Sequence, residues 1–499
     1  MTDTSNDTLG LLRDRLATVS DLNSVAALLH WDQETYMPPG GVPLRAEQLA
    51  TMSRLAHETL VSEETRRLLG AAEPQDPAEL ALLRLARRDH DRAARLPARL
   101  VAELSRARSL AQPVWARARA ESDWEAFAPQ LERILVLVRE SAEYLGYEEH
   151  PYDALLDLYE PGTKTSLLRE MFDGLKAELV PMIQRLPADE DRSRPLYGDF
   201  AEDKQEAFGR EIVTAFGYDW TRGRQDRVVH PFCLPLGGPE DVRITTRFEE
   251  DWLSPALFAT MHEAGHALYE QGVDPAYSRT PLAGGTSMGV HESQSRLWEN
   301  LVGRSRGFWG YYYPTLQDSF PEALGEIDLE SFYRAINEAK PSEIRVEADE
   351  LTYNLHILLR FELEIELLDG GLSVAGLPDA WNAKMEEYLD LTPESAAKGV
   401  LQDVHWSAGL FGYFPTYSIG NVLSAQLFEA ALARHPEMTG QIGDGEFGTL
   451  LGWLRENIHR HGSRYDPEDL VERATGRPLD PEPYLRYLKT KFGELYGLK

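Results

Sequence analysis

Cysteine is almost absent from this chain, because Cys233 is the only one among 499 residues. A single cysteine excludes an intrachain disulfide and is typical of proteins that fold in a reducing compartment. The N-terminal residues also lack the basic start and the apolar block that a secretory signal needs. We therefore expect a cytoplasmic protein with Cys233 as a free thiol.

Long apolar runs and positive charge are scarce as well. No stretch of about 18 residues lacks charged side chains, which excludes an ordinary membrane-spanning helix. The 82 acidic residues outnumber the 51 basic ones and give a formal net charge of -31. Because this charge repels phosphate backbones and anionic lipids, we expect neither nucleic acid nor a membrane as a partner.

The patterns that are present indicate helices. From about residue 8 to residue 220, Leu, Ala, Arg and Glu recur at spacings of three and four, interrupted by a Pro- and Gly-rich loop at 31–43. Segment 226–248 is rich in β-branched and aromatic residues and predicts two or three short strands. Helical patterning returns at 255–271, 291–304, 342–369, 376–390 and 420–434, whereas 272–290 and 404–419 look irregular.

No fixed-period repeat and no long Ser/Gly linker divides the chain. We therefore expect a mainly α-helical protein with a small three-stranded sheet. It forms one unit over residues 1–499, or two helical lobes about a cleft.

The segment HEAGH at 262–266 carries the strongest chemical signal. In the expected helix, which Ser254 can cap, His262 and His266 lie four residues apart on one face, where both imidazoles reach one metal ion. Glu263 projects about 100° round the helix, toward a water molecule on that ion, and can act as its general base. The alternative is a pair of surface histidines on an exposed helix.

A hydrolytic metal site needs a third protein ligand and an open position for water. Glu292 begins the next predicted helix, far enough downstream for the chain to double back on the first. His291 is the alternative ligand, and the residue pattern alone does not choose between these neighbours.

Two other protein classes share parts of this pattern. A di-iron carboxylate site is one, because Glu263-x-x-His266 is accompanied by Glu456-x-x-His459 in another helical segment. A binding protein that keeps the motif without activity is the other.

Six separated motifs stand in order along the chain: HPF at 230–232, DVRIT at 241–245, HEAGH at 262–266, HESQSRLWEN at 291–300, IRVEAD at 344–349 and GVLQDVHW at 399–406. Similarity extends to LHWDQETYMPPGG near the N-terminus and to FGYFPTYSIGN at 411–421. On these motifs, which span nearly the whole chain, the protein resembles the Taq-type metallocarboxypeptidase family.

The resemblance implies a large helical zincin-like fold with a long central groove, a metal-site core at about 225–420, and a homodimer. It implies one divalent ion per chain, Zn2+ or Co2+, bound by His262, His266 and Glu292. It further implies a carboxypeptidase of broad specificity that acts on peptides with a free C-terminus. An oligopeptidase or peptidyl-dipeptidase with the same metal site is the alternative.

Several more residues receive candidate catalytic or substrate-binding roles. His405 and Tyr417 are candidates for stabilising the negative charge on the scissile oxygen, although Tyr417 could also serve packing alone. By the family resemblance, Arg345 is the candidate clamp for the C-terminal carboxylate, a group that a guanidinium binds bidentately. The alternative for Arg345 is a surface pair with Asp349 on a helix.

By the family resemblance, His230 and Arg243 close the far end of the groove and limit substrate length. The alternative is a structural pair between Asp241 and Arg243 that holds the small sheet. Three further polar residues could orient the metal ligands or Arg345, or be satisfied in the core: His356, Gln402 and Asp403.

Overall fold

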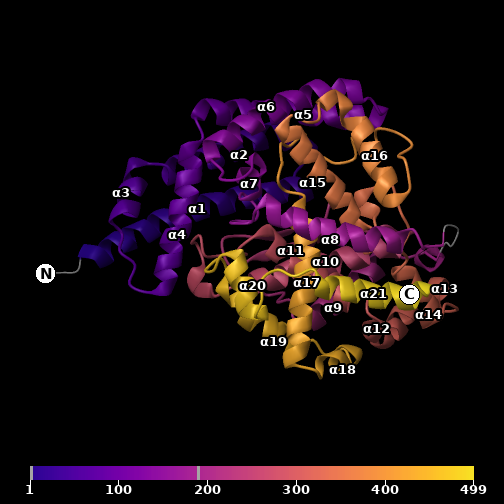
Figure 1. Cartoon of the computed structure of the whole chain (residues 1–499). Coiled ribbons are helices and arrows are strands. Elements are labelled where there is room, and N and C mark those ends of the chain that lie inside the picture. Colours follow the sequence, from indigo (N-terminus) through magenta and orange to yellow (C-terminus); the bar gives the residue numbers. More distant parts are fainter. Residues whose placement is uncertain (1–3, 188–191, 499) are drawn as a thin grey trace. The chain divides into compact units, whose positions relative to one another are not determined.

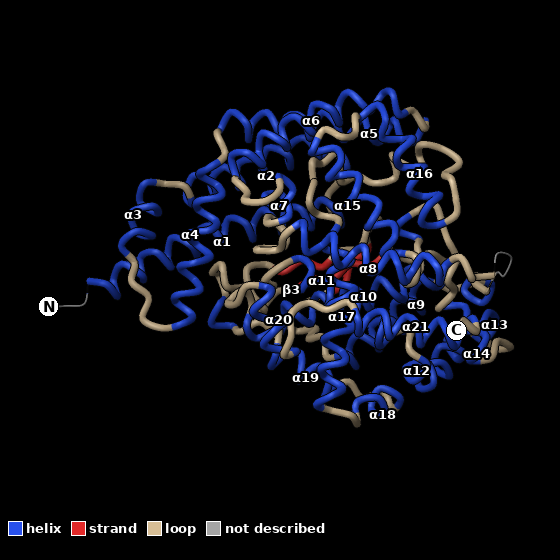
Figure 2. Tube along the Cα trace, in the orientation of Figure 1, coloured by secondary structure: helices blue, strands red, loops and turns tan. Residues whose placement is uncertain are grey.

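The computed structural model describes residues 4–187 and 192–498. Most of these residues are helical, and the strands among them form one small three-stranded sheet (Figure 1; Figure 2). This confirms the predicted fold class. The backbone forms two compact units, each built from three separate segments of the chain.

The first unit is formed from the described parts of Met1–Ala94, Arg192–Ile336 and Ser424–Leu479. Its strands are β1 (Gln225–Arg227), β2 (Cys233–Pro235) and β3 (Val242–Thr246). Its helices are α1 (Thr4–Thr35), α2 (Val42–Leu60), α3 (Glu63–Ala71), α4 (Pro77–Arg95), α9 (Glu202–Phe216), α10 (Leu253–Gly272), α11 (Met288–Arg296), α12 (Arg306–Ser319), α13 (Pro321–Leu324), α14 (Leu329–Ile336), α18 (Met438–Gly443), α19 (Gly448–Asn457) and α20 (Pro467–Thr475).

The second unit is formed from the described parts of Arg95–Asp191, Asn337–Leu423 and Asp480–Lys499. Its helices are α5 (Ala98–Glu121), α6 (Trp124–Leu145), α7 (Pro151–Leu156), α8 (Thr165–Ile183), α15 (Tyr353–Asp369), α16 (Leu377–Leu389) and α21 (Glu482–Tyr496). Helix α17 (Pro415–Arg434) begins in this unit and continues into the first one.

Helix α15 is an interior helix of the second unit. Its apolar side chains are buried all round, as expected of a helix surrounded by protein. Three polar residues at a spacing of four, His356, Arg360 and Glu364, are each fully buried on it. Such a stripe requires internal partners, because an unpaired polar group in a protein interior is costly.

The sheet has the order β1-β3-β2, with β1 parallel and β2 antiparallel to the central strand β3. Figure 2 shows the strands in red beside α10. The hydroxyl oxygens of Thr246 on β3 and Thr260 on α10 lie 3.0 Å apart, which ties the sheet to this helix. The sheet thus supports the helix that carries HEAGH.

Three predicted boundaries are wrong. Residues 31–35 are helical, because α1 continues to Thr35 before the Pro-Pro pair ends it. Residues 342–352 precede the helix predicted at 342–369, because the Asp349 carboxylate accepts the backbone N–H groups of Leu351 and Thr352 and fixes a turn there. The third error concerns 404–419, since α17 already begins at Pro415, a residue that suits a first helical turn.

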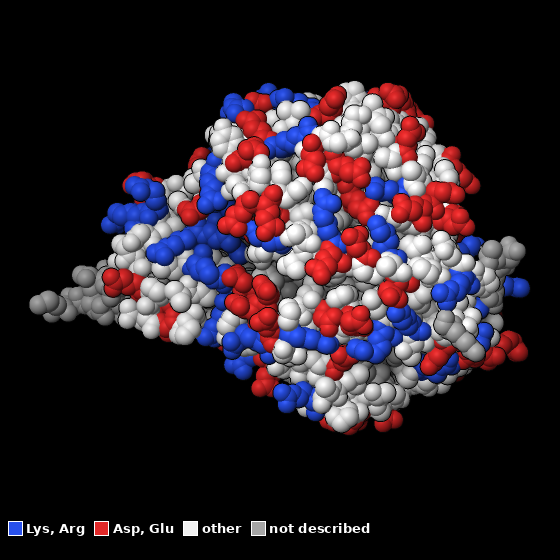
Figure 3. All heavy atoms as spheres, viewed as in Figure 1, with Lys and Arg blue, Asp and Glu red and all other residues white. Residues whose placement is uncertain are grey.

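Acidic and basic side chains are interspersed on the face shown in Figure 3. Among the described helices, none combines the length and the apolar character needed to cross a bilayer.

Candidate metal centre

Helix α10 carries the HEAGH segment in the interior of the first unit. Apolar side chains on several sides of the helix are buried, including Leu257, Met261 and Leu268. Trp252 precedes the helix without a side-chain capping bond, so the predicted cap at Ser254 is wrong. Burial, rather than a cap, stabilises this helix.

Helices α10 and α11 approach each other closely at Gly265. A Cβ atom on this glycine would lie 2.6 Å from both the carbonyl oxygen of Gln294 and the Cα atom of Ser295. Only a residue without a side chain allows this contact. Ser287 caps α11 by accepting the N–H of Val290.

This crossing brings His262, His266 and Glu292 together, with one donor atom of each within 4.8 Å of the others. Oε2 of Glu292 lies 3.6 Å from Nε2 of His262 and 3.4 Å from Nε2 of His266. Two imidazoles and one carboxylate form a donor set typical of hydrolytic zinc sites.

The far side of each imidazole has an acceptor. Nδ1 of His262 lies 2.8 Å from Oε2 of Glu299, and Nδ1 of His266 lies 3.1 Å from the carbonyl oxygen of His291. When each Nδ1 donates to its acceptor, each Nε2 keeps its lone pair for a metal. The residues present therefore fit a divalent ion.

Electrostatics favour the metal-binding forms of His266 and Glu292, but in His262 they favour the protonated ring. Burial lowers the pKa of His266 to about 3, so its ring is neutral. Burial also disfavours the charged form of Glu292, but Arg296 and His262 outweigh it and hold the pKa of that carboxyl well below its usual range. In His262 burial lowers the pKa, but Glu292 and Glu299 outweigh this effect, so the pKa of this imidazole is raised above its ordinary value.

Glu263 follows the first histidine on α10 and is 7% exposed. Burial raises the pKa of its carboxyl to about 7. A carboxyl with this pKa exchanges protons readily near neutral pH, which suits a general base that must also act as an acid.

The alternative ligand sets do not assemble. The His291 ring stacks on His266, at 4.4 Å between centroids, while its Nε2 lies 2.8 Å from Oε1 of Glu270. His459 is buried with Nε2 2.9 Å from the amide oxygen of Gln294, whereas Glu456 is exposed. Among the described residues, the two Glu-x-x-His pairs therefore do not form a di-iron site.

Cys233 lies on β2. Burial, with a smaller contribution from Glu263 and Glu270, raises the pKa of this thiol well above its ordinary value. The residue is therefore a protonated thiol near neutral pH.

Arg345 lies in the second unit, in the 3-10 turn η5 (Arg345–Glu347), and is 6% exposed. Its predicted position in a long helix is wrong, and so is the alternative pair with Asp349. The guanidinium instead bonds Asp403 through Nε and Nη2, both at 2.9 Å, and donates to the Tyr353 hydroxyl.

Arg360, on α15, binds the other oxygen of Asp403 at 2.7 Å. Two guanidinium groups therefore share one carboxylate. Burial disfavours the charge on Asp403, but the two arginines hold the pKa of this carboxyl well below its usual range.

The other two polar candidates lie in the same unit. The side-chain oxygen of Gln402 accepts the backbone N–H of Arg345. Burial keeps the pKa of His356 well below its ordinary value.

His405 and Tyr417 also lie together in the second unit. Nε2 of His405 is 3.2 Å from the Tyr417 hydroxyl, and Tyr417 lies in the first turn of α17. Burial lowers the pKa of His405 to about 3, so the imidazole is neutral near pH 7. A neutral imidazole can still donate one hydrogen bond.

His230 and Arg243 occupy the sheet region. His230 is exposed between β1 and β2. Nε and Nη2 of Arg243 on β3 donate to the two carboxylate oxygens of Asp241, at 2.9 and 2.8 Å. The guanidinium carbon lies 4.4 Å from the centre of the Trp31 ring. The structural pair considered from the sequence is present.

Sequence reasoning missed the polar residues behind the metal centre. Nε of Arg296 lies 2.7 Å from Oε1 of Glu292, and its Nη1 lies 3.3 Å from Oε2 of Glu299. Arg304 lies 3.4 Å from the other oxygen of Glu299. The spacing Glu292, Arg296, Glu299 on one helical face was the signal that could have revealed them.

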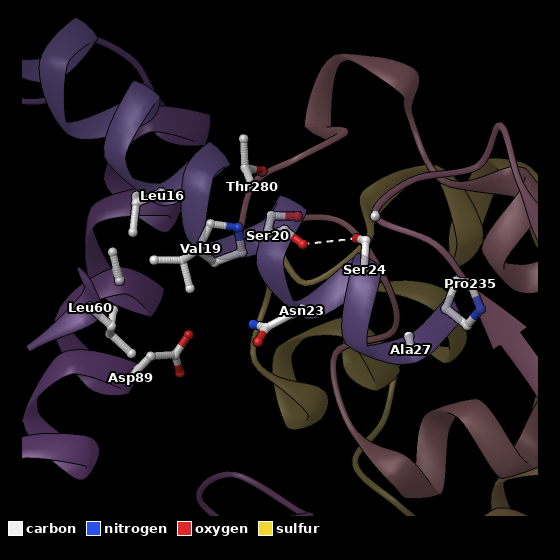
Figure 4. Close-up of a pocket in the computed structure, with 13 residues that line it drawn as sticks. Leu16, Val19, Ser20, Asn23, Ser24, Ala27, Leu60, Asp89, Pro235 and Thr280 are labelled. Atoms are coloured by element: carbon white, nitrogen blue, oxygen red, sulfur yellow. Dashed lines mark hydrogen bonds between the residues drawn. The ribbon is translucent and has the colours of Figure 1, made fainter. Parts of the chain in front are cut away.

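A separate hollow in the first unit has a volume of about 490 Å³ (Figure 4). Helix α1 forms one wall with Val19, Asn23 and Ala27, and Asp89 of α4 faces it from the opposite side. None of the predicted site residues lines it.

Known proteins match this chain over nearly its full length. A family model described as "Carboxypeptidase Taq (M32) metallopeptidase" matches residues 11–492. "Thermostable carboxypeptidase 1" of Thermus thermophilus is 44% identical, covering 95% of this chain and 96% of that protein. "Carboxypeptidase 1" of Bacillus subtilis is 39% identical, covering 97% and 98%.

Among solved structures, the M32 carboxypeptidase of Deinococcus radiodurans R1 is 44% identical and matches with a TM-score of 0.96, covering 99% of this chain and 100% of that one. These matches confirm the family resemblance seen in the motifs.

Proposed function

Since the chain belongs to the carboxypeptidase Taq (M32) metallopeptidase family, we propose that it removes single residues from peptides with a free C-terminus. Membership makes it a metal-dependent peptide hydrolase. The observation that carries the proposed chemistry is the convergence of His262, His266 and Glu292 within 4.8 Å.

In this proposal those three residues hold one divalent ion, Zn2+ or Co2+. The ion, when bound, acidifies a water molecule and polarises the scissile carbonyl. Glu263 accepts the proton of the attacking water and later delivers it to the leaving amine. The pKa of about 7 that burial gives this carboxyl supports both transfers.

Arg345 is proposed to bind the C-terminal carboxylate. The directly bonded set of Arg345, Arg360 and Asp403 holds two positive charges and one negative charge. A substrate carboxylate would balance the remaining positive charge in a buried place, where an unbalanced charge is costly. This supports a carboxypeptidase over an enzyme that cuts within chains.

His405 and Tyr417 are proposed to donate hydrogen bonds to the oxygen that becomes negative during attack. Their contact at 3.2 Å keeps the imidazole and the hydroxyl side by side, and when Nε2 of neutral His405 donates to the Tyr417 oxygen, the hydroxyl proton stays free for the substrate. His230 and Arg243 are proposed to limit how far a substrate extends, and the alternative for Arg243 is the structural pair with Asp241.

A cytoplasmic homodimer with broad residue preference completes the proposal. Light scattering coupled to size-exclusion chromatography measures the oligomeric state, and a monomer at micromolar concentration would contradict the dimer.

The decisive assay compares one unblocked tetrapeptide with the same peptide carrying a C-terminal amide, followed by mass spectrometry. The carboxypeptidase proposal predicts stepwise loss of single residues from the free acid and almost no cleavage of the amide. Release of dipeptides would indicate a peptidyl-dipeptidase. Internal cuts in both peptides would indicate an oligopeptidase.

A further inference from the structure

Arg296 touches two carboxylates that serve the metal centre in different ways. Its Nε lies 2.7 Å from Oε1 of Glu292, and its Nη1 lies 3.3 Å from Oε2 of Glu299. Glu299 in turn holds Nδ1 of His262 at 2.8 Å. Arg296 therefore connects Glu292, a proposed metal ligand, to Glu299, the hydrogen-bond partner of the proposed ligand His262.

The contact with Arg296 makes the two oxygens of Glu292 unequal. Oε1 is engaged by the guanidinium, whereas Oε2 faces Nε2 of His262 and of His266 at 3.6 and 3.4 Å. The hydroxyl of Ser295 lies 3.2 Å from Oε2 but 2.7 Å from the carbonyl oxygen of Glu292, so its proton has a closer acceptor. One carboxylate oxygen is thus directed at the imidazoles.

The local backbone suits this arrangement. Directly after Arg296 the helix widens into a π-helical turn, η4 (Leu297–Val302), which contains Glu299. Such single wide turns are frequent at functional sites because they change where side chains point. Arg304, beyond the turn, lies 3.4 Å from Oε1 of Glu299 and donates to the carbonyl of Ile336, which anchors the carboxylate from its other side.

We propose that Arg296 is a positioning residue of the metal centre, which makes Glu292 bind the ion through one oxygen and fixes Glu299 behind His262. The inference rests on the proposed metal site, because it concerns how that site is shaped. Arginine suits this role because its planar fork reaches two acceptors at once, whereas lysine offers a single nitrogen.

Loss of Arg296 should change the affinity for the metal ion in opposite directions, depending on whether its charge or its positioning of the ligands matters more. A positive side chain beside a divalent cation repels it, so removing the charge alone would tighten metal binding. If Arg296 mainly orients the ligands, its removal weakens binding, because loss of residues that orient metal ligands costs about 10- to 100-fold in affinity. The sign of the change therefore separates the two effects.

The experiment uses Zn2+ as the probe and measures its dissociation constant by competition with a chromophoric chelator. Arg296→Met is expected to weaken Zn2+ binding about 10- to 100-fold, and Arg296→Lys by a smaller factor. Arg334→Met is the matched control, because Arg334 binds Glu330 at the same i,i+4 spacing, with Nε 3.0 Å from Oε1, but on the surface. The control should bind Zn2+ as the wild type does.

Circular dichroism and thermal unfolding of the metal-free proteins show whether each variant folds. The Lys variant keeps the charge between the two carboxylates, so its Zn2+ affinity tests the proposal if the Met variant does not fold. Affinity that is unchanged in the Lys variant, or equal or higher in a folded Met variant, overturns the proposal.

X-ray absorption at the zinc edge gives a second readout. With Oε1 released, the Met variant is expected to show one more oxygen ligand than the wild type, and an unchanged ligand number overturns the single-oxygen claim. Failure of the wild type itself to bind one equivalent of Zn2+ would reject the proposed metal site. Normal wild-type binding with unaltered variants would reject only the role of Arg296.

Discussion

Glu263 combines burial with a position directly after the first histidine of the metal centre. Replacing it with Gln keeps the shape of the side chain but removes its ability to take a proton. We expect Glu263→Gln to lower kcat by about 10²- to 10⁴-fold, the usual contribution of general acid–base catalysis. Steady-state kinetics and metal analysis check this.

Zn2+ content is the control for that variant, and it should stay at the wild-type level. Turnover within tenfold of the wild type would contradict the role of Glu263 and would favour a protein that keeps the motif without using it.

Arg345 should bind the free carboxylate of a substrate, and not only stabilise the fold. We expect Arg345→Ala to lose about 2–5 kcal/mol of transition-state stabilisation on a free-acid peptide, which is at least about 30-fold in kcat/KM. The variant should also lose its preference for the acid over the amide, because the charge that distinguishes them is gone. Both values come from paired kinetics on the two peptides.

The control for this prediction is Arg279→Ala, since Arg279 forms a two-bond pair with Asp21 on the surface. Exposed ion pairs contribute little to stability, so this variant should behave as the wild type does on both peptides. If Arg345→Ala keeps the wild-type ratio of acid to amide cleavage, Arg345 does not read the carboxylate, whatever its effect on stability.

At the scale of elements, the close crossing of α10 and α11 depends on Gly265. A methyl group there meets the backbone of Gln294 and Ser295 at 2.6 Å, and backbone cannot move aside as a flexible side chain can. We expect Gly265→Ala to destabilise the protein by about 1–3 kcal/mol and to weaken Zn2+ binding, because Glu292 moves away from the histidines. Chemical denaturation and the zinc competition assay measure the two effects.

Gly452→Ala provides the comparison, because Gly452 is also within a helix and a Cβ there meets nothing within 4 Å. That substitution should be neutral or stabilising by up to about 1 kcal/mol. Similar stability and zinc affinity in the two variants would show that the crossing tolerates a side chain.

The spacing of residues predicted some elements well and others poorly. HEAGH and HESQSRLWEN gave the right two helices, because periodic burial decides whether a helix forms. Their ends were not predictable in the same way. The start of α10 is set by burial after Trp252 rather than by the available serine, and the turn before α15 is set by the bonds of Asp349.

The candidate site shows the same division. Spacing on one helix placed His262 and His266 together, but the choice of Glu292 over His291 depends on how α11 crosses α10. The pairing of Arg345 with Asp403 joins residues 58 apart in sequence, and local pattern carries no information on such contacts. The family resemblance, not periodicity, had singled out Arg345.

At the scale of the whole molecule, Glu364 should make stability depend on pH. This buried carboxylate on α15 accepts bonds from Tyr152 of α7, the Trp406 indole and the Gly412 backbone, and burial raises its pKa to about 7. In the unfolded chain a glutamate titrates near 4.3. Between these values the folded state binds more protons, so its contribution to stability falls as pH rises from about 4.5 to 7.

We expect that decline to reach about 4 kcal/mol at most, and Glu364→Gln to remove it, because glutamine does not titrate. Urea denaturation of both proteins across this pH range isolates the contribution as the difference between their slopes. Parallel curves would show that Glu364 has an ordinary pKa in the folded protein.

The most direct test is a titration of the chelator-treated protein with Zn2+, with release of the C-terminal residue from a free-acid peptide as the signal. We expect no activity before addition and a linear rise to a plateau at one equivalent per chain, with no such rise in His262→Ala. Full activity in the metal-free protein, or a plateau at two equivalents, would contradict a single ion held by His262, His266 and Glu292.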